Sequence, residues 1–530
     1  MDAKDESMGA LAPVVARLED AIGHDNVKTS KMERLLYSHD LAPLPKEAQI
    51  AFKNVPDIVV RPRTTEDVAR VVKIAAEENI PITPRGSSTW GLGGSVPVFG
   101  GILIDTTGLM NKIIKIDAEN LCVTAQAGCT WKQVYDACLE KGLLLGSYPS
   151  SFPSATLAGW VATGGVGMGS YKYGSAGFNI RDIEVVMPDG TIVNTGYQNV
   201  ADNMTGYNLS WLIIGSEGTL GVITQVTLKL TPFITLRPLS YAFPDLMALG
   251  APLKELTHTR VDPLHIAFSD GAHFALLKKA GKHAPEVGTL LNIVLEGAKE
   301  TVAYEEKVID EMMTKHGGKK MDDATAQHEW DERCYEFRAR EIGLGHIPGE
   351  GVIPVSAFSE VAKRTYLLMN EYKMTGAIIG TMVDKNTVMY MPYYFADFDD
   401  MVQLTSFAFN KKFSDLCFEF GGRPLGFGAF FAGNLDRIRG TGAKYIRDIK
   451  KTIDPQDIMN PGKLTGTTLR FGLKISPGIF NLAMDGMGVV KKMLPRDHLV
   501  DEKAAILAED RAKKERAEAV HQHPKTGGKH

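Results

Sequence analysis

The sequence predicts a protein of the α+β class, and three observations lead to that prediction. Short apolar runs alternate with stretches of helical periodicity through the first 232 residues. Three clusters of glycine stand between these segments, where the chain must turn tightly. After Pro232 the glycine clusters become rarer, aromatic residues increase, and strands alternate with amphipathic helices. These patterns indicate mixed helices and strands on both sides of Pro232.

Each predicted element follows from a local pattern. In residues 65–79 the apolar side chains share one helical face, and Thr64 or Thr65 can cap the helix. Gly142 ends the helix expected before it, and Pro188-Asp-Gly190 predicts a hairpin. Helices are expected at residues 65–79, 130–141, 301–316 and 359–372. Strands are expected at residues 58–60, 102–105, 112–116, 122–127, 182–187, 191–193 and 220–230.

Composition excludes several classes of protein. The 63 acidic and 59 basic residues give a net charge of −4, which argues against an electrostatic binder of nucleic acid. The five cysteines form no C-x-x-C pair, so we expect neither a disulfide framework nor a structural zinc site, and we expect a cytoplasmic, reducing environment. The N-terminus is too polar for a signal peptide, and no apolar run is long enough to span a bilayer.

The 53 glycines are spread unevenly, and three clusters of them stand at residues 85–94, 158–169 and 215–221. Glycine-rich loops at strand–helix junctions expose successive backbone N–H groups, which bind phosphate oxygens. Tight turning alone could explain one cluster, but three clusters in one unit favour a phosphate-bearing ligand. Neither the P-loop pattern nor the dinucleotide fingerprint is present, so such a ligand would be held in a different way.

Six motifs occur in order along the chain and together carry a resemblance to a known family. They are Pro84-Arg-Gly-Ser-Ser-Thr89, Thr156-Leu-Ala-Gly-Trp-Val-Ala-Thr-Gly-Gly165, Tyr173-Gly174, Pro188-Asp-Gly190, Gly215-Ser-Glu-Gly-Thr-Leu-Gly-Val-Ile-Thr224 and Asn460-Pro-Gly-Lys463. In this set the chain resembles the FAD-binding domain of the vanillyl-alcohol oxidase / p-cresol methylhydroxylase (PCMH) superfamily. Within that superfamily it is most similar to the branch of glycolate oxidase subunits and D-lactate dehydrogenases.

The resemblance implies FAD as cofactor and assigns residues to it. Arg85 to Thr89 would wrap the pyrophosphate, Ile223 would meet FAD through its backbone, and Asn460 would lie near the isoalloxazine. The full implied set is Pro84, Arg85, Gly86, Ser87, Ser88, Thr89, Pro149, Thr156, Gly159, Thr163, Gly164, Gly165, Gly221, Ile223 and Asn460. Some family members attach FAD covalently through a histidine whose place is Thr89 here, so we expect non-covalent FAD.

The resemblance also implies an organisation in domains. A PCMH-type FAD-binding domain with two subdomains would be followed by an α+β substrate or cap domain built on an antiparallel sheet. The expected segments are an N-terminal helical segment at 1–55, the FAD-binding domain at 56–232, the cap domain at 233–455, a return to the FAD domain at 456–472, and a C-terminal tail at 473–530.

The implied activity is oxidation of an alcohol or 2-hydroxy acid, with hydride passing to flavin N5 and electrons going on to a separate acceptor, as in a dehydrogenase. In the hydroxy-acid branch two histidines and an acid hold a divalent metal. The two histidine places of one motif are Thr381 and Val388 here, and the Glu-His of a later motif falls on Pro424 and Leu425. None of these side chains suits a metal or a base at neutral pH, so we expect no metal site.

Candidate catalytic residues are Arg338, Tyr390 and Tyr393. Arg338 matches a family arginine that binds the substrate carboxylate, and a guanidinium suits that task because its fork is bidentate. The alternative is a helix-surface arginine paired with Glu341 or Glu336. The two tyrosines are the expected proton-handling groups.

Three functions stay open at this point. The first is oxidation of an aromatic or apolar alcohol, which a Met-, Tyr- and Phe-rich stretch at residues 389–395 would suit. The tyrosine–arginine pair of the phenol-oxidising branch is, however, replaced here by Phe430-Phe-Ala-Gly433. A hydroxy acid is the second alternative. A catalytically silent flavoprotein for electron transfer or assembly is the third, because the family's base and metal ligands are missing.

The tail after residue 473 is unusual for the family. In residues 475–494 the side chains of Leu482, Met487, Val490 and Met493 fall on one helical stripe. This stripe could pack on its own domain, bind a partner protein or lie on a membrane surface. Any iron–sulfur acceptor would lie on another subunit, because the chain has no cysteine cluster. We also expect the chain to form an oligomer.

Overall fold

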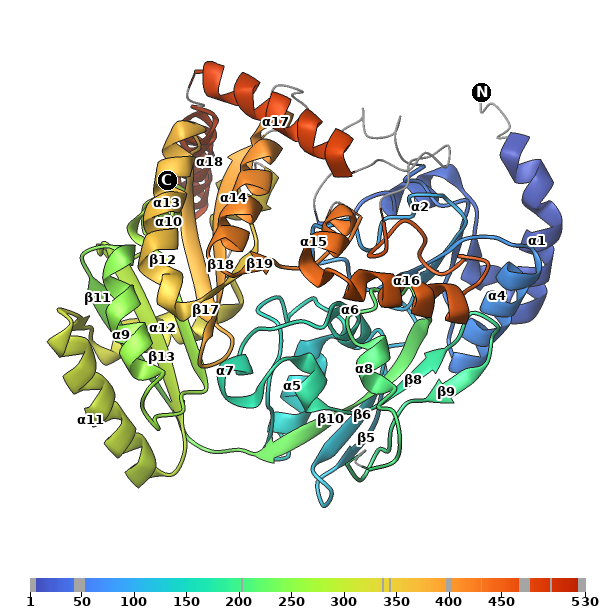
Figure 1. Ribbon diagram of the computed structural model, residues 1–530, viewed down its shortest axis with the longest axis horizontal. Coiled ribbons are helices and arrows are strands. Elements are labelled where there is room, and N and C mark those ends of the chain that lie inside the picture. The colour runs from blue at the N-terminus through green and yellow to red at the C-terminus, as the bar shows by residue number, and fades with distance from the viewer. Residues whose placement is uncertain are drawn as a thin grey trace, which may run out of the picture.

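The computed structural model describes residues 6–41, 53–201, 204–335, 338–342, 345–396, 403–429, 431–466, 477–495 and 498–522. Helices and mainly antiparallel sheets are combined in this part of the chain, which confirms the predicted α+β class. Its strands form three sheets, and Figure 1 shows the third sheet, with its helices, beside the first two.

The first sheet contains the N-terminal strands. Its order is β1 (Val27–Lys28), β2 (Ile58–Val60), β4 (Ile102–Asp105) and β3 (Ile82–Arg85), with β2, β4 and β3 parallel. Helix α4 (Thr65–Glu77) begins with a capping box, in which Thr64 accepts from the amide of Asp67 and Asp67 accepts from the amide of Thr64. Helix α1 (Glu6–Ile22) packs against α4, so the apolar faces of both helices cover this sheet.

The second sheet is antiparallel and is built around one long strand, β10 (Val222–Pro232). Its other strands are β5 (Ile113–Asp117), β6 (Cys122–Gln126), β7 (Leu143–Leu145), β8 (Ile180–Val186) and β9 (Ile192–Asn194). The predicted hairpin at Pro188 forms between β8 and β9, and Thr130 caps helix α5 (Trp131–Leu139). Helix α6 (Leu157–Thr163) lies on this sheet and ends at Gly164 in the left-handed conformation.

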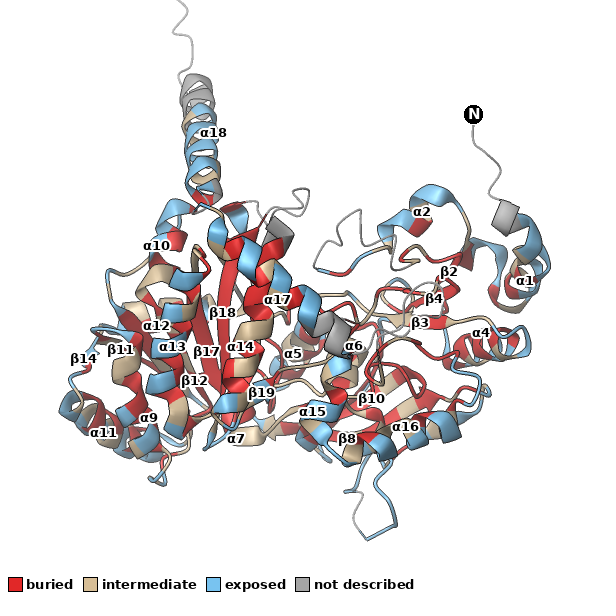
Figure 2. Ribbon diagram, turned by 45° about the horizontal axis from the view of Figure 1, so that its top comes forward, coloured by how far each residue is buried: buried red, intermediate tan, exposed pale blue. Residues whose placement is uncertain are grey.

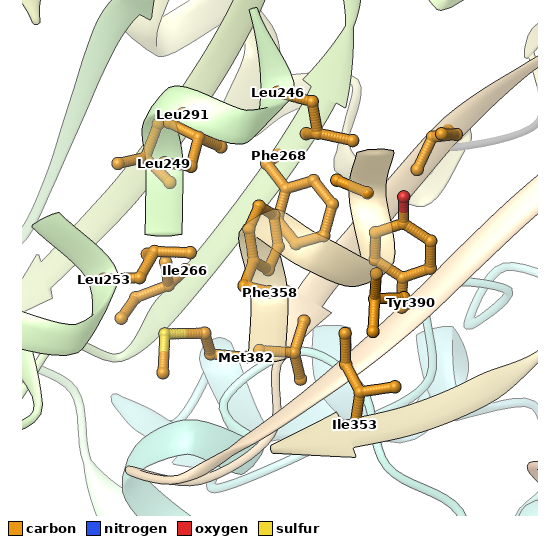
Figure 3. Packing of buried hydrophobic residues seen from close by; sticks show 14 of the residues in the cluster. Leu246, Leu249, Leu253, Ile266, Phe268, Leu291, Ile353, Phe358, Met382 and Tyr390 are labelled. Atoms are coloured by element: carbon orange, nitrogen blue, oxygen red, sulfur yellow. The ribbon is translucent and has the colours of Figure 1, made fainter. Parts of the chain in front are cut away.

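The third sheet starts with β11 (Leu236–Phe243), directly after β10 ends at Pro232. Its further strands are β12 (His265–Asp270), β13 (Thr289–Glu296), β14 (Lys319–Lys320), β15 (Gly345–Pro348), β16 (Gly351–Pro354), β17 (Gly376–Met382), β18 (Thr387–Ala396) and β19 (Arg423–Pro424). The helices packed on one face are α9 (Gly250–Leu256), α11 (Lys299–Lys315), α13 (Phe358–Glu371) and α14 (Phe407–Glu419). Figure 3 shows the core between this face and its helices, where Phe268, Phe358 and Tyr390 lie together.

The chain returns to the first sheet after helix α16 (Gly442–Ile453). The amide of Ile82 in β3 donates to the carbonyl of Ile458 at 2.7 Å, and the amide of Asn460 donates to the carbonyl of Ile82 at 2.7 Å. The segment after α16 therefore lies beside β3, far from it in sequence. The predicted domain limits stay a prediction.

Helix α17 (Pro477–Met493) packs on the helices of the third sheet, mainly on α14. Its buried side chains are Met484 and Lys491, and Met487 of the predicted stripe packs against the core of the third sheet. Leu482 and Met493 of the same stripe are instead 75% and 80% exposed. Packing on its own domain therefore accounts for Met487, whereas contact of the exposed residues with a partner or a membrane surface stays a prediction. Residues 475–476 lie outside the described part.

Helix α18 (Leu499–Gln522) begins against α10 (Gly271–Lys279) and then extends away from the rest of the molecule (Figure 2). Arg511 donates to the carbonyl of Ala280 at 2.7 Å, and Val500 is buried. Among the helices of the described residues, none combines the length and the apolar character needed to cross a bilayer.

Candidate active site

A cavity of about 580 Å³ lies where the three sheets meet, and its volume is typical of ligand pockets. Its walls come from the segment after β3, from α6 and the loop before it, from the turn before β10, and from β18. The lining includes Pro84, Arg85, Gly86, Ser87, Ser88, Thr89, Pro149, Thr156, Gly159, Thr163, Gly164, Gly165, Gly221 and Ile223. The structure therefore gathers these predicted cofactor residues around one cavity. Their contacts with a cofactor stay a prediction.

The segment after β3 approaches the start of α6 very closely at Gly86. A Cβ on Gly86 would lie only 2.1 Å from the hydroxyl oxygen of Thr156, so no other residue fits there without displacing Thr156. The Thr156 hydroxyl is buried and has no hydrogen-bond partner within the described residues. Ser88 adopts φ of 56°, in the left-handed region. A backbone without a side chain beside an unpartnered hydroxyl fits a phosphate-bearing cofactor.

The turn before β10 connects the cavity to the third sheet through Glu217. This residue has φ of 52°, and its carboxylate accepts from the amides of Phe427 and Gly428 at 3.3 and 2.8 Å. Burial raises the pKa of Glu217 to about 7, against the opposing effect of the two amides. Glu217 therefore joins the FAD-binding half to the loop after β19.

Asn460 supports the cavity from behind. Its amide group donates to the carbonyl of Gly94 at 2.9 Å and to that of Glu217 at 2.7 Å. It thereby holds together two of the loops that form the cavity, but it is not one of the lining residues. Asn460 thus fixes loops that form the wall, and its predicted place near the isoalloxazine stays a prediction.

The wall from the third sheet is mostly apolar. Met389 and Met391 of β18 and Leu425 line the cavity, and Leu425 stands at a place where the metal-binding relatives are expected to have a histidine. Thr381 is buried and donates to the carbonyl of Ile266, and Val388 faces the core on the other side of the sheet. In the described part of the chain, no three histidine, cysteine or carboxylate side chains come together as a metal site.

Neither predicted tyrosine lines the cavity. Because side chains alternate along a strand, Tyr390 points away from Met389 and Met391 and packs beside Phe268 and Phe358 (Figure 3). Tyr393 is on the nearer face, but its hydroxyl is 2.8 Å from Nδ1 of His273, in a buried pair behind the wall. Burial raises the pKa of both phenols well above the ordinary value. The structure thus corrects the expectation that they lie beside the substrate.

Arg338 does line the cavity, from the short helix η5 (Arg338–Ile342). Its side chain is only 9% exposed and forms an ion pair with buried Glu329 at 3.1 Å. Glu341 instead pairs with Lys282 at 2.7 Å, and Glu336 lies outside the described residues, as does Phe430. Arg338 is therefore a buried arginine at the cavity and not a helix-surface residue.

Glu350 and Trp90 are among the polar residues of the cavity that the sequence analysis missed. Glu350 lies in the loop between β15 and β16, and its carboxylate accepts from the indole N–H of Trp90 at 2.9 Å. Both line the cavity. The one available signal was the pattern Pro348-Gly-Glu-Gly351, an acid held between two glycines in a loop.

Comparison with known proteins identifies the two halves. Residues 56–196 match the FAD binding domain family, and residues 237–464 match the family of the C-terminal domain of FAD linked oxidases. The chain is 28% identical to the glycolate oxidase subunit GlcD of Bacillus subtilis over 466 residues, which cover 85% of this chain and 96% of that protein. It is also 28% identical to a D-lactate dehydrogenase of Archaeoglobus fulgidus, with 81% of this chain and 95% of the other covered.

Solved structures agree with this assignment. The chain superimposes on p-cresol methylhydroxylase with substrate bound at a TM-score of 0.75 and 20% identity, which covers 86% of this chain and 97% of the other. An alkyldihydroxyacetonephosphate synthase gives a TM-score of 0.69 at 23% identity, with 85% of each chain covered. At these identities the likeness shows the fold. The chain therefore carries the two domains of an FAD-linked oxidoreductase in the PCMH-type fold, its cofactor is FAD, and it is similar to glycolate oxidase subunits and D-lactate dehydrogenases.

Proposed function

We propose that the chain is a dehydrogenase for 2-hydroxy acids that carry a bulky apolar side chain. The observation that supports this is that Arg338 lines the same cavity as the thioethers of Met389 and Met391. A buried guanidinium can bind a carboxylate, and flexible thioethers suit an apolar group of variable shape. Bound FAD supplies the hydride acceptor for such a reaction.

The roles of the chain's own residues follow from their places in the cavity. The loops at residues 85–94 and 158–169 would hold FAD through backbone amides, with Gly86 and Thr156 at their closest approach. Glu329 fixes the Arg338 guanidinium, so that its remaining N–H groups can orient the substrate carboxylate. Leu425 would exclude water near the apolar group.

A neutral aromatic or apolar alcohol is the second candidate substrate. It is favoured by the cavity wall made of Met389, Met391, Leu425 and Trp90, which offers far more apolar than charged surface. In that case Arg338 would serve only as the partner of Glu329. Turnover of a hydroxy acid, compared with turnover of the matching alcohol without a carboxylate, distinguishes the two candidate substrates.

We further propose that neither a covalent flavin bond nor a resident divalent metal is needed. Thr89 stands in the cavity at the family's histidine place, and a threonine hydroxyl lacks the nucleophilic nitrogen for attachment to FAD. Thr381 and Leu425 likewise offer no imidazole at the family's metal places. Electrons would pass to an acceptor on another protein, because the five cysteines are dispersed along the chain and cannot hold an iron–sulfur cluster together.

Steady-state turnover with an artificial dye as electron acceptor tests the proposal. The panel contains glycolate, lactate, longer aliphatic and aromatic 2-hydroxy acids, and the matching alcohols without a carboxylate. We expect the bulky hydroxy acids to give the highest kcat/KM, with slower turnover when oxygen replaces the dye and no loss of rate in EDTA.

Each other outcome contradicts a defined part of the proposal. Higher kcat/KM for the matching alcohols would favour the neutral substrate. Strong inhibition by EDTA would show that a metal takes part. Absence of turnover with every compound would favour a catalytically silent electron-transfer or assembly subunit.

A further inference from the structure

We propose that Glu350 accepts the hydroxyl proton of the substrate and that the indole of Trp90 positions its carboxylate. The inference rests on the proposed alcohol oxidation, and it fills the role that the absent family histidine leaves open. Oxidation of an alcohol by hydride transfer requires a group that takes the O–H proton. That group must be a titratable side chain that lines the cavity.

Backbone hydrogen bonds hold the Glu350 loop on both sides. The amide of Gly349 donates to the carbonyl of Pro392 at 2.7 Å, and the carbonyl of Glu350 accepts from the amide of Leu425 at 3.0 Å. Gly351, the next residue, is already paired in β16 with Tyr390 and Pro424. The loop is therefore fixed to the central strand β18, and the carboxylate projects from a rigid base.

Trp90 reaches Glu350 from the opposite side of the cavity. It belongs to the first glycine loop, at residues 85–94, and its Nε1 donates to Oε2 of Glu350 at 2.9 Å. A Cβ on Gly426 would lie 1.9 Å from the Trp90 ring, so Gly426 provides the space that sets the indole's orientation. This contact orients one carboxylate oxygen and leaves Oε1 without a hydrogen bond from any described residue.

The other acids of the cavity are engaged elsewhere. Glu217 accepts two backbone amides, and Glu341 is paired with Lys282. The charged groups that face the cavity together with Glu350 are Arg85, Glu217, Arg338, Arg340 and Glu341. Within the described chain no ion pair joins any of them to Glu350. Among the acids that line the cavity, Glu350 is thus the one whose carboxylate is oriented by a neutral donor, the Trp90 indole, and keeps one oxygen free for the substrate.

Burial raises the pKa of Glu350 to about 7, and the Trp90 hydrogen bond acts in the opposite direction. A base with a pKa near the working pH is both deprotonated in a large fraction and strong enough to take a proton. A carboxylate exposed to water would be a poorer base than Glu350, because its ordinary pKa is near 4. The environment thus gives this residue the proton affinity that the reaction needs.

The O–H proton of the substrate goes to Oε1 of Glu350, and the carbinol C–H bond breaks with its electron pair passing as hydride to bound FAD. The C–O bond becomes a carbonyl. The substrate loses two electrons and two hydrogens, FAD is the oxidant, and Glu350 releases its proton to solvent before the next turnover.

The rate of anaerobic flavin reduction in the holoenzyme tests the inference. Glu350→Gln keeps the size of the side chain and the Trp90 contact but cannot accept a proton. We expect about 10²- to 10⁴-fold slower reduction, the usual contribution of a positioned base, with flavin content and substrate Kd unchanged. Glu360→Gln, at an exposed acid of α13 that does not line the cavity, is the matched control and should reduce at the normal rate.

The pH profile gives the readout that a merely structural role would not change. In the unmodified protein the reduction rate should rise with pH through about 7 and then level off, since the carboxylate must be ionised. Trp90→Phe removes the hydrogen bond that favours the ionised form, so the rise should move to higher pH with the plateau largely retained.

Failure of this inference differs from failure of the proposed function. If no alcohol or hydroxy acid reduces the flavin of the unmodified protein, the proposed function is wrong. If substrate reduces it and Glu350→Gln reacts at the normal rate, only the role of Glu350 is wrong. If Glu350→Gln loses its flavin, the pH profile of flavin reduction in Trp90→Phe tests the role of Glu350 instead. A profile that is the same as in the unmodified protein would overturn the proposal.

Discussion

At the scale of single residues, Gly86 and Thr156 bring two walls of the cavity into close approach. A Cβ added at Gly86 would lie 2.1 Å from the Thr156 hydroxyl oxygen, which is buried and has no hydrogen-bond partner within the described residues. Any atom added at residue 86 must displace either Thr156 or the backbone of the loop. We therefore expect FAD binding to depend on the absence of a Cβ at this position.

Gly86→Val should weaken FAD binding. Overpacking of this kind costs about 1–3 kcal/mol, so we expect roughly 10- to 100-fold weaker binding and a purified protein with little flavin. Flavin is measured in the supernatant after acid precipitation, which also tests non-covalent attachment. Gly433→Val is the control, because a Cβ there meets open space. Equal flavin content in both variants, or yellow flavin in the pellet, would contradict the account.

Residues whose role depends only on their neighbours in the sequence could be predicted. The glycine loops could be predicted, since each needs a bare backbone at a fixed place in a short motif. Tyr390 and Tyr393 could not be placed, because a strand buried on both faces gives no alternation to show which side meets the cavity. Glu350 was missed because its partner Trp90 is distant in sequence and its pKa depends on tertiary burial.

At the scale of secondary-structure elements, α17 is held on the third sheet's helices by one face. Asp485 pairs with Lys411 and Lys412 at 3.0 and 2.8 Å, and Lys373 donates to the carbonyl of Leu494 at 2.6 Å. Gly488 lies at the closest contact, where a Cβ would be 2.8 Å from the hydroxyl oxygen of Tyr372. The position of α17 thus depends on a small residue at this crossing.

Gly488→Val should detach α17 without affecting the flavin. We expect faster limited proteolysis in and after α17 and a loss of about 1–3 kcal/mol of packing free energy, with FAD content unchanged. Gly486→Val, two residues earlier on the same helix, points into open space and should leave proteolysis unchanged. The same protease sensitivity in both variants would show that α17 is not anchored at Gly488.

Elements with strong local signals could be predicted closely. The helix expected at residues 65–79 is α4, with Thr64 as its cap, and the expected strand at 102–105 is β4. The order of the third sheet could not be predicted, because β12 pairs with β17 across a large sequence separation. The inward face of α17 could not be predicted, since it includes Gly488 and Lys491, residues that do not look apolar in sequence.

At the scale of the whole molecule, the cavity forms only when both family domains and the returning segment are in place. Gly86 comes from the FAD-binding half, Met389 and Glu350 come from the third sheet, and Asn460 ties the loops from behind. The FAD-binding half could be predicted from its motifs, whereas the substrate wall is defined by residues that depart from the family pattern. The central claim is that this composite cavity holds FAD and oxidises a carbinol carbon there.

Anaerobic flavin reduction is the most direct test of that claim. The holoenzyme is mixed at saturation with the best compound of the panel, either unlabelled or deuterated at the carbinol carbon, and the visible absorbance of oxidised flavin is followed. The account predicts bleaching in a single turnover, several-fold slower with the deuterated compound because its C–H bond breaks in that step. Flavin that stays fully oxidised in the presence of every alcohol and hydroxy acid tested would contradict it.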